Sequence, residues 1–475
     1  MPEEMKTSKE EALKKIQAAG VAGMGGGGFP THVKLAADVD TVIANGVECE
    51  PLLWSDKNLM LAYPDDVVEG LGFAMELTGA RKGIVAIKAK NQDVASAMEK
   101  AVRRRRRFLE GSVELALLPN NYPMGDEFVL VQQVLQRTIP EMGLPLNVGA
   151  AVCNTATLKA TAAALKSGEP LISRIVTVAG AVGKPVTAEV PVGTPYSFLL
   201  ELAGGTPLRK PHFIDGGPMM GTLSVDPGET IQKTTSGILV LPGDHQVVRR
   251  HLIDSSNRLR TARAACCLCN ECTQVCPRNA LGHRIHPDRL MRSVASGITH
   301  DLEAYTGAFY CCECGLCTVY GCPMYLDPCG MNIEIKKRLR SSGVKPDSLK
   351  KSKPDRFFYI KQVPVSRLVS RLGLKPLEIP CTHLDRVDNP PYVVLKTDGC
   401  AGAPSKPIVK KGDRVQKGDL IAEPDGNVST ALHAGIDGTV EWVVDRKIKI
   451  TAPISGRTSR RSGKTGSSTD PGVTT

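Results

Sequence analysis

The chain has 475 residues, 42% of them hydrophobic, and a formal net charge of +11, and its length predicts three or four domains rather than one core. Aromatic residues make up only 4%, which argues against stacking platforms for single-stranded nucleic acid, so we expect no nucleic-acid partner. No apolar run approaches the about 20 residues that span a bilayer, and residues 1–6 lack a signal-peptide pattern, so a soluble cytoplasmic protein with no transmembrane segment is expected.

A glycine-rich stretch follows the first helical pattern. Ser8 and Glu11 form a capping box, which predicts a helix over residues 8–19. Residues 23–28 satisfy G-x-G-x-x-G, but the strand candidate, residues 41–47, comes after the glycines, whereas a dinucleotide fingerprint follows a strand. Glycines let backbone N–H groups approach an anion, and a helix is expected near Thr31. The loop is therefore interpreted as a phosphate cradle, with a flexible turn as the alternative.

Residues 60–120 alternate helical and strand-like segments, which indicates α/β layering with strands at 83–87 and 113–117. Residues 103–107 are five consecutive arginines. They are interpreted as a solvated helix end that complements the helix dipole, with a partner site as the alternative. From about 172 to 242 the pattern becomes rich in strands, and a short helix is expected at 196–203.

Ten of the fifteen cysteines lie between Cys266 and Cys322. The first run has the spacing C-x2-C-x2-C-x3-C-P, which is the bacterial ferredoxin signature, and the second repeats it with one extra residue before its last cysteine. Zinc usually takes two paired C-x2-C knuckles, and dense disulfide scaffolds belong to short secreted chains, so two [4Fe-4S] clusters are favoured over both alternatives.

The fourth cysteine of each run is followed by proline and leaves in a different direction from the other three. In two-cluster ferredoxins that cysteine serves the other cluster. The pattern therefore assigns four cysteines to each cluster and leaves Cys267 and Cys312 as spare neighbours. The first set is Cys266, Cys269, Cys272 and Cys322, and the second set is Cys311, Cys314, Cys317 and Cys276.

The positive charge is concentrated in residues 336–375, which contain thirteen Lys or Arg and two Asp. A solvated linker is one interpretation, and a docking surface for an acidic protein or a membrane surface is the other. Residues 455–475 are rich in Ser, Gly and Thr and are expected to be disordered.

Residues 23–34, together with the Asn-Gly-Val-Glu-Cys-Glu-Pro segment at 45–51, resemble the flavin and NADH site of the family that contains the NADH-binding subunit of respiratory complex I. They are closer still to the RnfC component of the Rnf complex and to the cobalamin reductases of propanediol-utilisation microcompartments. Segments 122–127 and 152–157 resemble two further pieces of that pocket. The resemblance implies FMN with NADH stacked on it and carries over as ligands Gly25, Gly26, Gly28, Lys34, Asn45, Glu48, Glu50, Glu127, Asn154 and Thr157.

The later segments resemble other modules of this family. The strand-rich region resembles an SLBB β-grasp module, and residues 410–421 and 433–440 resemble halves of a biotinyl/lipoyl-type barrel-sandwich domain. The expected hairpin tip, residues 428–432, has no lysine, so it carries neither lipoyl nor biotinyl groups. The fold class is thus a multidomain α/β protein. Its expected parts are an FMN/NADH-binding α/β domain (1–170), an SLBB-like β-grasp domain (171–245), a ferredoxin-like two-cluster domain (250–340), a basic linker (341–384), a barrel-sandwich domain (385–454) and a tail (455–475).

These parts form an electron-transfer chain. A flavin accepts the two electrons of NADH together and releases them one at a time, and the clusters carry single electrons. Rnf members of the family carry the barrel-sandwich module before the glycine loop, whereas here it follows the cysteines. The resemblance therefore implies an NADH-dependent cobalamin reductase in the lumen of a bacterial microcompartment. Its expected partners are NADH, cobalamin or a cob(I)alamin adenosyltransferase, and a microcompartment shell protein. The alternatives are an Rnf-like electron-transfer protein and a non-enzymatic electron-relay scaffold.

Overall fold

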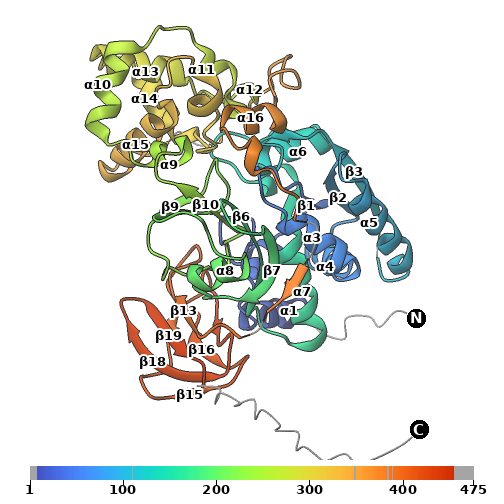
Figure 1. Ribbon diagram of the computed structural model, residues 1–475. Helices are drawn as coiled ribbons and strands as arrows, with labels where there is room; N and C mark the ends of the chain where they lie inside the picture. Colours follow the sequence, from blue (N-terminus) through green and yellow to red (C-terminus); the bar gives the residue numbers. More distant parts are fainter. Residues whose placement is uncertain (1–7, 110, 347–348, 382–383, 388, 454–475) are drawn as a thin grey trace, which may run out of the picture.

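The computed structural model describes residues 8–453 except 110, 347–348, 382–383 and 388 (Figure 1). The predicted disordered tail, residues 455–475, lies outside the described residues. Helices α10 to α15 form a lobe at one end of the molecule, and the C-terminal strands lie at the other. The N-terminal domain and a second sheet occupy the space between them (Figure 1).

The N-terminal domain is built on a parallel sheet with strand order β3-β2-β1-β5. The strands are β1 (Thr41–Gly46), β2 (Lys82–Lys88), β3 (Ser112–Leu118) and β5 (Ala150–Asn154), so the strands expected from the sequence are present. Parallel strands buried on both faces read as continuous apolar runs, as β2 does. The helices of this domain are α1 (Lys9–Ala18), α2 (Thr31–Leu35), α3 (Ser55–Ala62), α4 (Pro64–Thr78), α5 (Gln92–Arg105), α6 (Glu127–Leu135) and α7 (Thr155–Ser167).

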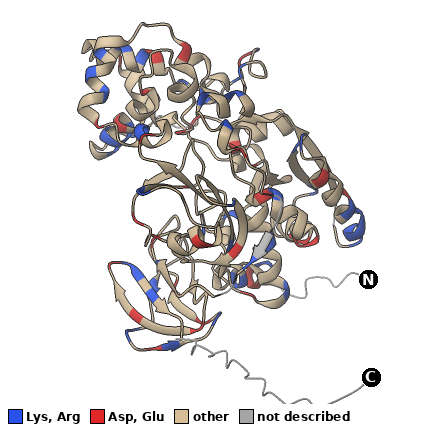
Figure 2. Ribbon diagram, in the orientation of Figure 1, with Lys and Arg blue, Asp and Glu red and all other residues tan. Residues whose placement is uncertain are grey.

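Two local expectations in this domain are met by specific contacts. The Ser8 and Glu11 capping box begins α1, and α2 begins at Thr31 directly after the glycine loop. The arginines at the end of α5 form a blue group in Figure 2 and are partly tied down, because Arg104 pairs with Asp65 and Arg105 pairs with Glu69. This end of the helix is thus both solvated and anchored to α4.

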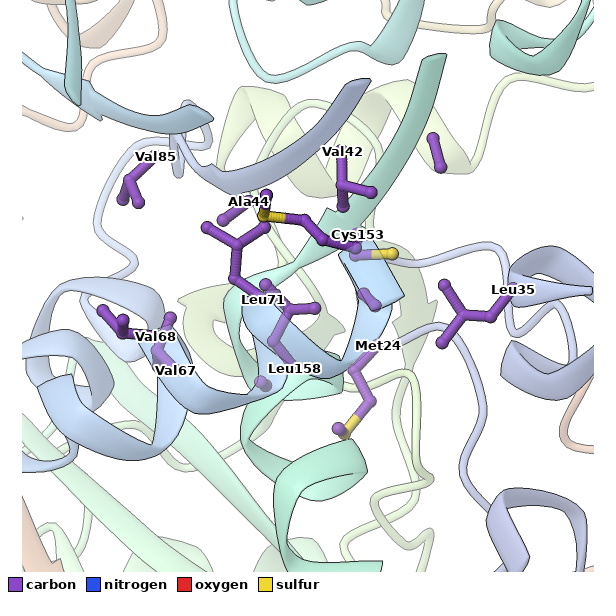
Figure 3. Packing of buried hydrophobic residues seen from close by; sticks show 14 of the residues in the cluster. Met24, Leu35, Val42, Ala44, Val67, Val68, Leu71, Val85, Cys153 and Leu158 are labelled. Atoms are coloured by element: carbon purple, nitrogen blue, oxygen red, sulfur yellow. The ribbon is translucent and has the colours of Figure 1, made fainter. Parts of the chain in front are cut away.

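The core of the domain lies between the sheet and helices α4 and α7 (Figure 3). Val42, Ala44 and Leu71 are fully buried there, and Leu158 reaches the same core from α7. The two helices approach so closely that a Cβ added at Gly70 would lie 2.0 Å from the Leu158 carbonyl oxygen. Glycine is therefore required at this helix crossing.

A second, six-stranded sheet has the order β12-β7-β6-β10-β8-β9. Its first strands, β6 and β7, form an antiparallel pair, and α8 (Tyr196–Leu202) packs Tyr196 and Leu199 into its core. The edge strand β12 comes from far along the chain and pairs in parallel with β7. The strands are β6 (Ser173–Gly180), β7 (Val186–Pro191), β8 (Pro211–Asp215), β9 (Thr222–Ser224), β10 (Gly237–Pro242) and β12 (Leu384–Arg386).

The cysteine-rich segment is helical, and most of its cysteines lie on the loops and turns between short helices, whereas Cys272 lies in α11 and Cys329 in α15. Arg258 from α10 pairs with Asp327, which caps α15, so these two helices are joined. The elements are α9 (Gln246–His251), α10 (Ser255–Ala265), α11 (Glu271–Gln274), α12 (Pro277–Ala280), α13 (Pro287–Ser296), α14 (Leu302–Thr306), a 3₁₀ turn (Gly307–Tyr310), a π-helical turn (Cys317–Gly321) and α15 (Pro328–Ser341).

Residues 341–384 are only partly the linker that the sequence predicts. Strand β11 (Val363–Pro364) pairs with β4 (Asn121–Tyr122), and α16 (Val365–Arg371) buries Leu368 and Val369 in the same core as Tyr122. The linker prediction is therefore wrong for residues 363–374. The many Lys and Arg residues of this segment predict exposure to solvent, but α16 also has an apolar face, which packs into this core.

The C-terminal strands form two small sheets, β13-β19-β18-β15 and β14-β16-β17, around one apolar core. Most of the segment expected as a hairpin tip is buried rather than presented to solvent, since Ser429 and Thr430 are at most 3% exposed, whereas Val428 is 40% exposed. The strands are β13 (Tyr392–Lys396), β14 (Lys406–Pro407), β15 (Arg414–Val415), β16 (Leu420–Glu423), β17 (Leu432–His433), β18 (Gly438–Val444) and β19 (Lys447–Thr451).

Replacing Gly70 by Ala should destabilise the N-terminal domain, because the new methyl group meets the Leu158 backbone and one helix must move. Overpacking of this kind costs about 1–3 kcal/mol. Denaturant unfolding followed by circular dichroism measures the loss. Ser96→Ala, on the exposed face of α5, is the control and should leave the midpoint unchanged. A Gly70→Ala protein as stable as the wild type would contradict the packing described here.

Candidate functional site

The glycine loop, residues 23–28, is fixed by one hydrogen bond within the loop and by two hydrogen bonds to other segments. Gly28 N donates to Gly23 O, Met24 N donates to the Thr157 hydroxyl at 2.9 Å, and Arg174 donates to the Met24 carbonyl at 2.7 Å. Gly26 has a φ of +108°, and a Cβ added at Gly26 would meet no atom within 4 Å. The loop therefore presents backbone to open space, as a cradle for an anion requires.

The carboxyl ends of β1 and β5 lie beside this loop. Asn45 and Asn154 are register partners on these neighbouring parallel strands, so their side chains leave the sheet at the same edge. Asn45 donates to the Gly125 carbonyl, and Asn154 caps α7 through Ala156 N. Ligands of open α/β sheets bind at this edge, outside the carboxyl ends of the strands.

Lys34 and Glu127 reach the same region from α2 and α6. Lys34 Nζ donates to the Val152 carbonyl at 2.8 Å. Burial raises the pKa of Glu127, and the nearby Lys34 partly offsets this increase. The sequence-predicted residues from four separate segments thus converge on one side of the sheet.

Glu48 and Glu50 differ sharply in their surroundings. Glu48 Oε1 is buried and has no hydrogen-bond partner, and burial, followed by the charge of Asp56, raises its pKa to about 8. An unpaired buried oxygen of this kind fits a residue that meets a bound group. Glu50 instead accepts hydrogen bonds from Met219 N at 2.9 Å and Met220 N at 3.1 Å, in the loop between β8 and β9.

The first cysteine set opens to the surface. Cys266, Cys269, Cys272 and Cys322 line one cavity together with the exposed Leu268 and Met324. Leu268 and Asn270 have φ values of +58° and +59°, and this left-handed backbone curls the loop around the cavity. Leu326 N lies 3.3 Å from Cys322 Sγ, as a backbone N–H that stabilises a thiolate would.

Three of the four cysteines of the second set are buried beside the N-terminal domain, and the fourth, Cys311, is half-buried. Cys276, Cys314 and Cys317 are 7–8% exposed. The Tyr122 hydroxyl donates to the Cys314 carbonyl at 2.8 Å. Arg278, two residues after Cys276, pairs with both oxygens of Asp126 at 2.8 and 2.9 Å.

These sets match the chemistry of iron-sulfur ligands, since each supplies four thiols and all fifteen cysteines are free. Among the described residues, no three His, Cys, Asp or Glu side chains converge as a single-metal site would. Of the two spare cysteines, Cys267 is exposed, whereas Cys312 is partly buried and lies beside Cys314.

Sequence reasoning missed three residues of this region. Tyr122 and Arg278 join the second cysteine set to the N-terminal domain, and Cys329 adds a buried thiol beside Cys272 and Cys317. Cys329 stands seven residues after Cys322, outside the ferredoxin spacing. Its only signal in the sequence is that it is one more cysteine close to the second run.

Family models match four parts of the chain. Residues 16–163 match the Nuo51 FMN-binding domain, residues 175–223 match the SLBB domain, residues 265–327 match a 4Fe-4S dicluster domain, and residues 381–457 match the RnfC barrel sandwich hybrid domain. These matches confirm the expected fold class and the cofactors FMN and [4Fe-4S]. The strand β12 belongs in space to the second sheet although it lies within the last match.

Similar curated proteins extend over nearly the whole chain. Cobalamin reductase PduS of Citrobacter freundii is 35% identical over 440 residues, covering 92% of this chain and 95% of that protein. Cobalamin reductase PduS of Salmonella typhimurium is also 35% identical, over 94% of this chain and 98% of its own length. The C component of the Na⁺-translocating ferredoxin:NAD⁺ oxidoreductase complex of Acetobacterium woodii is 34% identical, but the match covers only 56% of this chain and 58% of that protein.

An FMN-binding domain joined to a two-cluster domain defines a flavin and iron-sulfur oxidoreductase that transfers electrons. Within that class, the chain belongs to the PduS family of cobalamin reductases. No described helix is both long and apolar enough to cross a membrane.

Glu50→Gln should change how stability depends on pH. Burial raises the pKa of Glu50 from 4.5 to about 7, so the folded state binds more protons than the unfolded state between these pH values. The free energy of unfolding of the wild type should therefore carry a component that decreases as pH rises from about 4.5 to about 7. The glutamine variant lacks this component.

Denaturant unfolding at pH 5 and pH 7.5 compares the two proteins, with Glu169→Gln on the surface as the control. If the free energy of unfolding changed by the same amount between these pH values in the wild type and in Glu50→Gln, the pKa of Glu50 would not be raised in the folded protein.

Proposed function

We propose that this chain is an NADH-dependent cobalamin reductase, which takes electrons from NADH and delivers them to a corrinoid. The supporting observation is the 35% identity to two proteins named cobalamin reductase over 95% and 98% of their lengths. Bound FMN accepts two electrons together and releases them singly, and iron-sulfur clusters carry single electrons, which is the chemistry that NADH lacks by itself. The family's order of modules, with the barrel-sandwich domain last, supports the same function.

The N-terminal residues hold the flavin in this proposal. Backbone N–H groups of Gly25 and Gly26 bind the phosphate, because the loop is open at Gly26 and lies before the α2 N-terminus. Gly28 contributes by closing the cradle, since its N–H donates to Gly23 O. Lys34 adds a positive charge nearby. The other ligands, at the carboxyl edge of the sheet, are Asn45, Glu48, Glu127, Asn154 and Thr157, and Glu50 lies towards the nicotinamide nucleotide.

The eight ligand cysteines hold two [4Fe-4S] clusters, with Cys266, Cys269, Cys272 and Cys322 in the first set and Cys276, Cys311, Cys314 and Cys317 in the second. The depths of the two sets suit an electron-transfer chain. The second set is joined to the flavin domain through Tyr122 and Arg278. The first set opens to the surface, where an acceptor can approach.

Partners and location follow from this activity. The corrinoid binds this chain only transiently. The reduced corrinoid is consumed by a reaction that alkylates its cobalt, so we propose a cob(I)alamin adenosyltransferase as partner. A microcompartment shell protein and a place in the microcompartment lumen complete the proposal, together with the domain limits expected from the sequence. Rnf-type relatives are matched over only 54–58% of their length in the three examples from Acetobacterium, Clostridium and Rhodobacter, which favours the cobalamin reductase over an Rnf-like protein.

Gly27→Val should abolish FMN binding without unfolding the protein. A Cβ at Gly27 meets nothing within 4 Å in the protein, and the backbone there has no positive φ, so the protein itself tolerates a side chain on the loop where this proposal places the phosphate. Anaerobic reconstitution with FMN, desalting and absorbance spectroscopy measure the bound flavin. Gly228→Ala, in an exposed loop, is the control and should retain it. Wild-type protein without flavin absorbance would contradict the proposal for the N-terminal domain.

Cys269→Ala and Cys314→Ala should each lower the iron content from about eight per chain to about four or fewer, because each removes one ligand of a four-thiol set. Both variants should reduce corrinoid more slowly with NADH and still show bleaching of the flavin by NADH. Iron analysis and anaerobic spectroscopy give the three readouts.

Cys267→Ala, which removes an exposed spare thiol, is the matched control and should keep its iron. Zinc in place of iron would contradict the cluster assignment. A Cys314→Ala protein that reduces corrinoid at the wild-type rate would show that the clusters lie outside this reaction.

A further inference from the structure

Cys329 is a buried thiol that belongs to neither proposed ligand set. It lies in the first turn of α15, is 7% exposed, and packs against Cys272 of the first set and Cys317 of the second. Its thiol is also within hydrogen-bonding reach of the Cys311 and Cys317 thiols. One non-ligand sulfur therefore touches both sets and contacts two ligands of the second.

The position of Cys329 is fixed by a chain of polar contacts rather than by packing alone. Its backbone N donates to the Thr318 hydroxyl at 2.9 Å, and Thr318 Oγ1 donates to Asp327 Oδ1 at 2.8 Å. Asp327 is held in turn by Arg258 at 2.8 Å. Thr318 directly follows Cys317, so these contacts tie the first turn of α15 to a ligand of the second set.

The location argues against Cys329 as a fifth ligand. The four protein ligands of a [4Fe-4S] cluster bind four different irons and therefore lie apart, at the corners of a tetrahedron. A sulfur within hydrogen-bonding reach of both Cys311 and Cys317 lies between two such corners. A thiol placed there can donate its S–H to a ligand sulfur, as a weak hydrogen bond.

We infer that Cys329 is a positioning residue that donates its S–H to the ligand sulfur of Cys311 or Cys317 and so raises the reduction potential of the second cluster. This inference rests on the proposed function and its ligand sets. A reduced cluster carries one more negative charge than the oxidised cluster, and a donor to its sulfurs stabilises that charge. Hydrogen bonds to the sulfurs are among the factors that set cluster potentials.

The test is a redox titration of the holoprotein followed by electron paramagnetic resonance, with iron analysis on the same samples. Cys329→Ala removes the donor and should lower the midpoint potential of one of the two clusters while about eight irons per chain remain. Cys329→Ser keeps a hydroxyl donor and should restore the potential towards the wild-type value. Cys381→Ala removes a buried thiol outside both sets and is the matched control, with no shift expected.

Three results would overturn the inference: an unchanged or higher midpoint potential in Cys329→Ala, an iron content that falls to about four, which would make Cys329 a ligand, or a Cys329→Ser protein that behaves as Cys329→Ala does. A failure of the proposed function would look different. Wild-type protein that holds its clusters and reduces no corrinoid would contradict the proposed function, while the potentials of the variants would still decide the role of Cys329. Wild-type protein without iron-sulfur clusters would overturn both.

Discussion

The contact between the second cysteine set and the N-terminal domain is the constraint on which the rest of the arrangement depends. The Tyr122 hydroxyl and the Cys314 carbonyl are both withdrawn from water, so each satisfies the other at 2.8 Å, and Arg278 and Asp126 form a bidentate pair nearby. The Arg278 guanidinium also lies 3.6 Å from the centre of the Phe128 ring. Removing one partner of such a pair leaves a buried group unsatisfied, which makes the interface specific.

One hydrophobic core continues this contact across four parts of the chain. It contains Leu52 and Tyr122 from the N-terminal domain, Leu239 from the second sheet, Leu316 from the cysteine-rich segment, and Leu368 from α16. A core of this kind cannot form within any one of these parts. The domains are consequently held as one body, which suits electron transfer between groups bound in different domains.

The glycine cradle likewise depends on distant segments. Gly28 O accepts a hydrogen bond from Ala401 N, and Lys233 Nζ donates to both Gly20 O and Ala431 O. A Cβ at Gly28 would lie 3.0 Å from the Cys400 Cα. The C-terminal module, whose segment 428–432 has no lysine, therefore supports the loop that we propose to hold the flavin.

The amino-acid sequence by itself determined the parts whose signal is local. Cysteine spacing, the capping box at Ser8, the apolar runs of β1 to β3 and the glycine loop all depend on neighbours within a few residues, and each could be predicted. Only the tertiary structure decided the roles of Tyr122, Arg278, Cys329 and Glu50, because their partners lie 152 to 192 residues away or, for Cys329, outside a recognised spacing. The packing of α16 was not predicted either, because its apolar residues stand among many Lys and Arg and meet partners far away in the sequence. Burial and pairing between distant segments leave no local pattern to read.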